Sequence, residues 1–243
     1  SVEVITNPSA KYDAESGAVI NIVMSKNLVT GYRGNVFANF TQGVFPRYDG
    51  GMSQFFKNEK IDFFANYTYS HDKINRGQDD VVNYLDGSNT IDQTFMSNTN
   101  RNTWSKTHNF NFNFDYSLNE KNTLSLSSNM LVLPYFEYKI INNTEVFEAN
   151  QNLDYYFDAT NFSNDDKYNL GFDLDFVHQF KKAGEKLSAN AHFTTYNYNR
   201  DQNVKSNYFD RNNSFLASTA YRTDNHQDTK IYTAKADYTL PID

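Results

Sequence analysis

Aromatic or apolar side chains alternate strictly with polar ones along residues 107–118. One parity carries His108, Phe110, Phe112, Phe114, Tyr116 and Leu118. The other parity carries Asn109, Asn111, Asn113, Asp115 and Ser117. A period of two is typical of a β-strand, because successive side chains of a strand point to opposite faces. The block also has about the length, ~9–11 residues, that a tilted strand needs to cross a bilayer. It therefore predicts a membrane-crossing β-strand.

The same alternation recurs along the chain and predicts eight strands. These strands are residues 31–42, 48–57, 61–71, 107–118, 123–133, 167–180, 187–198 and 229–240. Short charged turns follow at residues 57–60, 119–122 and 181–186, whereas long polar segments lie at residues 71–106, 134–166 and 199–228. Short turns at one end and long loops at the other are typical of an outer-membrane barrel. We expect the short turns in the periplasm and the long loops outside the cell.

The composition agrees with a barrel that has a polar interior. Aromatic residues make up 16% of the chain, although the mean hydropathy is −0.73. Apolar side chains that alternate with polar ones explain both values. No apolar run reaches the ~18 residues of a transmembrane helix. Cysteine is absent, so disulfides and thiolate metal sites are excluded. The net charge of −7 argues against nucleic acid as a partner.

The cost of charge in hydrocarbon indicates which parity meets lipid. We expect outer-membrane lipid to contact the apolar set, which is Phe110, Phe112, Phe114, Leu170, Phe172 and Leu174. The polar set would then face the lumen, with Asn111, Asp115, Asp173, Asp175 and His192 as its candidate members. A soluble barrel of the lipocalin type would invert this arrangement and hold its apolar side chains inside. Long strands with ring-rich faces favour the membrane barrel.

Residues 1–26 contain a recognisable motif. It reads Val4-Ile5-Thr6-Asn7-Pro8-Ser9-Ala10-Lys11-Tyr12-Asp13-Ala14-Glu15, followed by Gly17 and Ile20-Asn21-Ile22. This segment resembles the end of the plug domain in TonB-dependent outer-membrane receptors of the Bacteroidota type. The residues that carry the resemblance are Asn7, Pro8, Ser9, Ala10, Tyr12 and Gly17. Ser16 stands where a glycine is common in that family.

The resemblance implies an all-β fold, an antiparallel transmembrane β-barrel preceded by the last strands of a plug domain. Residues 1–26 would be the end of the plug, and residues 27–243 would be the first eight strands of a 22-stranded barrel. Such a segment lies in the middle of a longer receptor, so we expect the chain to be a fragment. We also expect that its eight strands do not close on themselves. TonB would be a partner through the plug region that is missing here.

An acidic and aromatic stretch, residues 134–166, is the candidate loop for ligand capture. Its candidate contact residues are Tyr135, Tyr138, Glu145, Glu148, Tyr155 and Tyr156. Stacking on the rings, or attraction of a cationic ligand or metal complex, is one interpretation. The alternative is structural, because long loops fold over one another through aromatic packing while carboxylates keep them soluble.

Nothing in the sequence indicates an enzyme. The five histidines are scattered without metal-ligand spacing, and no Gly-x-Ser-x-Gly motif occurs. We expect no catalytic residue, no metal and no cofactor.

Three functions are consistent with these observations. The first is a TonB-dependent receptor that imports a scarce solute. The second is a structural or partner-binding barrel, joined to a surface lipoprotein or other outer-membrane subunits without active uptake. The third is a small stand-alone eight-stranded enzyme or adhesin.

Overall fold

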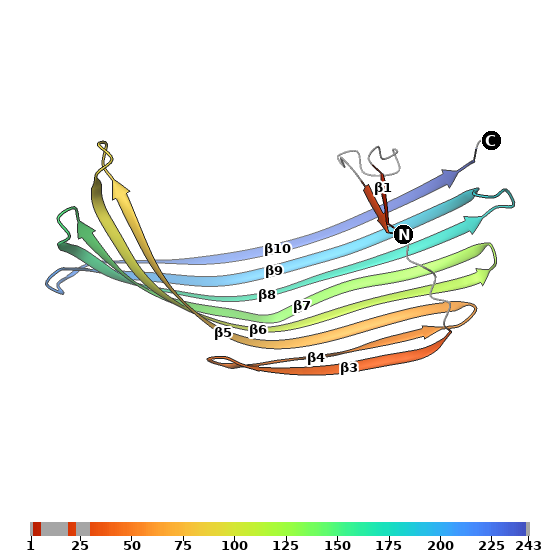
Figure 1. Ribbon diagram of the computed structural model, residues 1–243, viewed down its shortest axis with the longest axis horizontal. Helices are drawn as coiled ribbons and strands as arrows, with labels where there is room; N and C mark the ends of the chain where they lie inside the picture. The colour runs from red at the N-terminus through yellow and green to blue at the C-terminus, as the bar shows by residue number, and fades with distance from the viewer. Residues whose placement is uncertain (1, 6–18, 23–29, 242–243) are drawn as a thin grey trace.

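The computed structural model describes residues 2–5, 19–22 and 30–241 (Figure 1). Their main feature is one antiparallel sheet in the order β10-β9-β8-β7-β6-β5-β4-β3. Its strands are β3 Gly31–Gln42, β4 Pro46–Lys57, β5 Ile61–Leu85, β6 Ile91–Asn119, β7 Asn122–Glu148, β8 Leu153–Gln179, β9 Lys186–Asp210 and β10 Phe215–Thr239. Every strand pairs with its neighbour in sequence, as in an up-and-down barrel. The prediction of eight antiparallel strands is confirmed.

A separate two-stranded sheet pairs β1 (Val2–Ile5) with β2 (Val19–Ile22), and Val2 lies opposite Ile22. Both strands fall within residues 1–26, the stretch expected to be the end of a plug. The motif residues Asn7, Pro8, Ser9, Ala10, Tyr12 and Gly17 lie outside the described residues. Within the part of the chain that the structure covers, no helix is long and apolar enough to cross a membrane.

Apolar side chains form a band on one face of the large sheet, which we call the outer face. One row of directly paired residues across this band is Phe56, Phe63, Phe114, Leu126, Leu174, Ala191 and Ala234. Leu126 and Leu174 are 36% and 46% exposed. Such exposure is unfavourable in water but favourable against lipid. The six side chains predicted to face lipid all lie on this outer face.

Aromatic residues border the band. On β5, β6 and β8 the last row contains Tyr69, His108 and Tyr168, and the Tyr69 and His108 rings lie 4.9 Å apart. At the opposite border, Tyr116 pairs with Ile61, and Tyr238 pairs with Leu187. Amphipathic rings are typical of the two interfaces of a membrane barrel. The band between them has about the height that the hydrocarbon requires.

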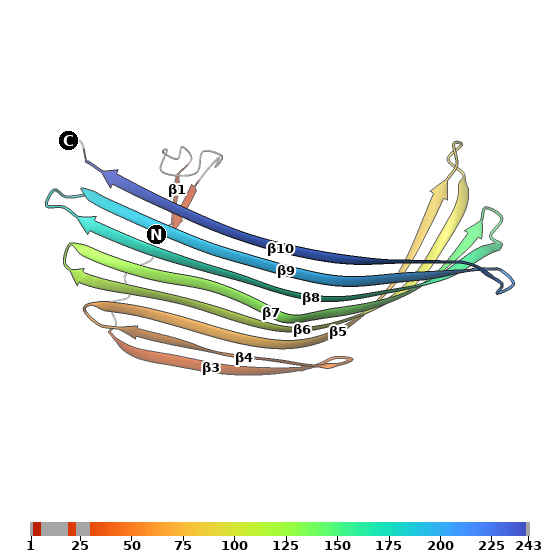
Figure 2. The ribbon, with the colours of Figure 1, turned by 180° about the vertical axis from the view of Figure 1, so that it is seen from behind.

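The prediction of three long loops is wrong, because most of residues 71–106, 134–166 and 199–228 continue the strands in the structure. Strands β5 to β10 have 25 to 29 residues. At ~3.4 Å per residue, they are far longer than a tilted crossing of a ~30 Å core needs. The sheet therefore rises well past the apolar band as a continuous curved wall (Figures 1 and 2).

The wall ends in three tight tips of similar design. At the β5–β6 tip, the Asp86 Oδ1 atom accepts hydrogen bonds from the Ser88 and Thr90 amides, at 2.8 and 2.9 Å. At the β9–β10 tip, the carboxylate of Asp210 repeats this pattern with the amides of two following residues. Each tip contains one residue with positive φ, namely Asn89, Gln151 and Asn213. These are turns in which an Asp or Asn side chain substitutes for backbone partners.

The sheet is open. Strands β3 and β10 are its two edges and do not pair with each other in the described part of the chain. This confirms the expectation that these eight strands do not close on themselves. Unpaired edges cannot be tolerated in lipid, so the sheet is part of a larger barrel wall.

Candidate ligand site on the inner face

The face opposite the apolar band, which we call the inner face, is mostly polar within the band, with Phe37, Phe55, Phe64 and Leu131 among its apolar exceptions. The structure places Asn111, Asp115, Asp173, Asp175 and His192 on this face. Their side chains bond across strands: His192 Nδ1 lies 2.8 Å from Asp173 Oδ1, and Asn190 donates to Asp175 at 2.9 Å. Polar groups that satisfy one another in this way suit a lumen or a plug contact.

Beyond the band, the inner face is also the more covered one. Ser163 is fully buried and Asp165 is 5% exposed, whereas their outer-face neighbours Asn164 and Asp166 are exposed. The inner face is therefore where a built site can form.

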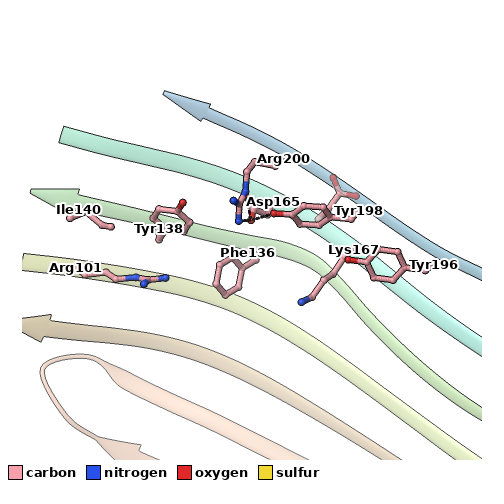
Figure 3. Close-up of a pocket in the computed structure, with 10 residues that line it drawn as sticks. Arg101, Phe136, Tyr138, Ile140, Asp165, Lys167, Tyr196, Tyr198 and Arg200 are labelled. Atoms are coloured by element: carbon pink, nitrogen blue, oxygen red, sulfur yellow. Dashed lines mark hydrogen bonds and ion pairs between the residues drawn. The ribbon is translucent and has the colours of Figure 1, made fainter. Parts of the chain in front are cut away.

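A hollow of about 410 Å³ lies on this inner face, just past the apolar band (Figure 3). Four strands line it. The lining side chains on the inner face are Arg101 from β6, Phe136, Tyr138 and Ile140 from β7, Asp165 and Lys167 from β8, and Tyr196, Tyr198 and Arg200 from β9. Rings and cations thus alternate around one cavity.

Asp165 is the centre of a hydrogen-bond network at the wall of the hollow. Arg200 donates to it from Nε and from Nη2, the latter at 2.8 Å. Ser163 Oγ donates at 2.5 Å and the Tyr198 hydroxyl at 3.0 Å. Burial raises the pKa of Asp165, but the hydrogen bonds from Arg200, Ser163 and Tyr198 outweigh burial and hold this pKa below its ordinary value. The carboxylate is therefore ionised and fully occupied by internal partners.

Tyr198 and Arg200 respond to the same carboxylate. Burial and the hydrogen bond to Asp165 raise the pKa of Tyr198 to about 12. The hydrogen bond to Asp165 likewise raises the pKa of Arg200. The guanidinium carbon of Arg200 lies 5.4 Å from the centre of the Tyr198 ring. The three side chains form one preorganised unit.

Arg101 is held on the opposite side of the hollow by a ring. Its guanidinium carbon lies 4.8 Å from the centre of the Tyr138 ring, which is a cation–π distance. Its Nε atom donates to Thr103 at 3.3 Å. The Tyr138 hydroxyl accepts from Gln202 at 3.1 Å, which fixes the ring. Among the described residues no carboxylate pairs with Arg101.

A bulge in β7 brings Phe136 and Tyr138 into the hollow. Before it, Leu133 pairs with Lys167, and after it Phe136 pairs with Asp165, so β7 has one extra residue around Pro134. An extra residue reverses the faces of all residues that follow. Even-numbered positions of β7, such as Leu126, face outward below the bulge and inward above it.

The capture residues predicted for the 134–166 segment do not converge. Only Tyr138 lines the hollow. Tyr155 also lies on the inner face, but Tyr135, Glu145 and Tyr156 lie on the outer face, and Glu148 lies where β7 ends. They belong to strands β7 and β8 and not to a loop. Sequence reasoning missed Arg101, Lys167, Tyr198 and Arg200, because strand register alone brings them together. The described residues contain no group of three side chains that could hold a metal ion.

An antiparallel sheet with an apolar outer band, aromatic borders and a polar inner face defines an outer-membrane β-barrel protein. A model of the outer membrane protein beta-barrel family matches residues 178–243, which include β9 and β10. The protein is located in the bacterial outer membrane. No curated protein matches the sequence.

Proposed function

We propose that the protein is a TonB-dependent outer-membrane receptor that imports a scarce solute through a plugged barrel, and that it is not an enzyme. One observation carries the proposal: a segment resembling the end of a plug precedes an outer-membrane barrel sheet in the same chain. The polar inner face supports it, because a lumen that receives a plug must supply hydrogen-bond partners. Ligand capture would precede a TonB-driven rearrangement of the plug.

The proposal is tested on the full-length protein in its host. Crosslinking in cells should join the periplasmic side of the plug to TonB, and loss of TonB should abolish energy-dependent uptake while the barrel still assembles. Heat-modifiable migration of the barrel provides the assembly control. A correctly assembled full-length protein that never contacts TonB would contradict the proposal.

The second candidate function is partner binding without uptake. Exposed apolar side chains at two tips favour it, because apolar patches of this kind mark interaction sites. Val81 and Leu85 belong to the β5–β6 tip, and Phe215 and Leu216 to the β9–β10 tip; all four are exposed. Copurification of a stoichiometric surface lipoprotein or barrel subunit, without any TonB contact, would favour this function. The third function, a stand-alone eight-stranded barrel, would need β3 to pair with β10.

A further inference from the structure

We infer that the hollow on the inner face binds an organic anion, a solute with a carboxylate or phosphate group and a flat apolar body. The inference names the class of solute for the transporter proposed above and rests on that proposal for the import step. The binding step itself depends only on the site.

The balance of charge is the first argument. On the inner face the hollow has three cationic side chains, Arg101, Lys167 and Arg200, against the single carboxylate of Asp165. Asp166 also lines the hollow, but its side chain points to the outer face, where it accepts a hydrogen bond from Asn199 at 3.0 Å. The hollow is therefore cationic in a protein whose net charge is −7.

The state of the cations is the second argument. Arg200 is committed to Asp165, but Arg101 and Lys167 have no anionic partner within the described residues. Both are half-buried. Cations that are partly desolvated and unpaired bind an anion more strongly than cations in open water do. Arg101 also offers the fork of donors that matches a carboxylate or phosphate.

The rings are the third argument. Phe136 and Tyr196 line the hollow and offer apolar surface for the body of the solute, and in Figure 3 Phe136 lies between Arg101 and Lys167. Asp165 acts as a positioning residue, because it holds Arg200 and Tyr198 in place without being free to meet a ligand. A cationic solute is disfavoured, because the carboxylates of Glu137 and Glu145 on β7 and of Asp158 on β8 lie on the outer face, away from the hollow.

The test is a binding titration on the purified full-length protein in detergent, with benzoate and phenyl phosphate as probes. Benzamide and benzylamine serve as the neutral and cationic counterparts. We expect the two anions to bind, with an affinity that falls as salt rises. The variants Arg101→Gln and Lys167→Gln should each weaken anion binding by about tenfold or more. Lys167→Arg should retain most of it.

The matched control is Lys139→Gln. Lys139 is an exposed cation of β7 on the outer face, opposite Asn102. Its substitution should leave anion binding unchanged. The inference would be overturned if benzamide or benzylamine bound as well as the anions, or if no anion bound at all. It would also be overturned if the Arg101→Gln/Lys167→Gln double variant bound anions as well as the unchanged protein does. Anion binding without TonB contact would instead count against the proposed import and leave this site intact.

Discussion

Asp165 holds three side chains in place from a position that is almost closed to solvent. Ser163, Tyr198 and Arg200 all donate to it. Replacing it with Asn removes the charge but nearly keeps the shape, so Arg200 is left half-buried without an anion. We expect Asp165→Asn to lower the free energy of unfolding by about 1–3 kcal/mol, measured by urea unfolding of the full-length protein in detergent. Asp166→Asn, on the exposed outer face, should change it far less.

The same network predicts how stability depends on pH. Because the pKa of Asp165 is lowered in the folded protein, its contribution is present above the ordinary value of 3.8 and is lost as pH falls further. Tyr198 behaves oppositely. Its raised pKa means that its contribution is present below 10 and is lost as pH rises through about 12. Unfolding at pH 3, 7 and 12 would show both limits. The Asp165→Asn variant should lose the acid dependence at this site, and an unchanged acid limit would contradict the assignment.

At the scale of elements, the membrane-crossing part of each strand could be predicted and its continuation could not. In residues 107–118 lipid selects one parity, so the pattern is visible. Above the band both faces of the wall meet water, and residues 199–203 are polar at every position. Only pairing with neighbours then specifies a strand. The tips did carry a signal, since Asp86-Gly87 and Asp210 with its Asn neighbours are turn formers.

The candidate site shows the same limit in a sharper form. Tyr138 has the parity that faces lipid below Pro134, so extrapolated alternation places it outside. The bulge in β7 turns it inward. Asp165 and Arg200 are 35 residues apart and meet only because β8 and β9 pair in one register. The alternation of side chains in the sequence predicts which face of a strand each residue occupies, whereas the residues that meet in a site depend on strand register and on bulges.

The tip between β7 and β8 offers a test at this scale. Gln151 has a φ of 65°, which costs free energy for a residue with a Cβ atom. We expect Gln151→Gly to stabilise the hairpin end by about 1 kcal/mol, seen as slower hydrogen exchange of the last β7 and β8 amides. Ala149→Gly, at a tip position without positive φ, should instead speed up exchange. Equal effects of the two substitutions would show that the turn is formed differently.

At the scale of the whole molecule, position along the wall and not exposure in the isolated sheet should govern access to water. Leu174 and Phe162 both lie on the outer face of β8, and Leu174 is the more exposed, at 46% against 36%. We expect Leu174→Cys to resist a water-soluble thiol reagent in intact membranes, while Phe162→Cys reacts. The chain has no native cysteine to interfere. Both cysteines should react after denaturation. Equal labelling of the two in membranes would show that the apolar band is assigned to the wrong part of the sheet.

The short β3–β4 hairpin sets the depth at which the protein sits. Strand β4 pairs with β5 only as far as Tyr48 and His71, so among the described residues the next fourteen positions of β5, up to Leu85, have one side without a backbone partner. Amides in that state need water, which the hydrocarbon cannot supply. The hydrocarbon core of the membrane can therefore extend along β5 no further than His71. This limit coincides with the aromatic border formed by Tyr69, His108 and Tyr168. The backbone pairing and the aromatic side chains therefore indicate the same position for the membrane surface, independently of each other.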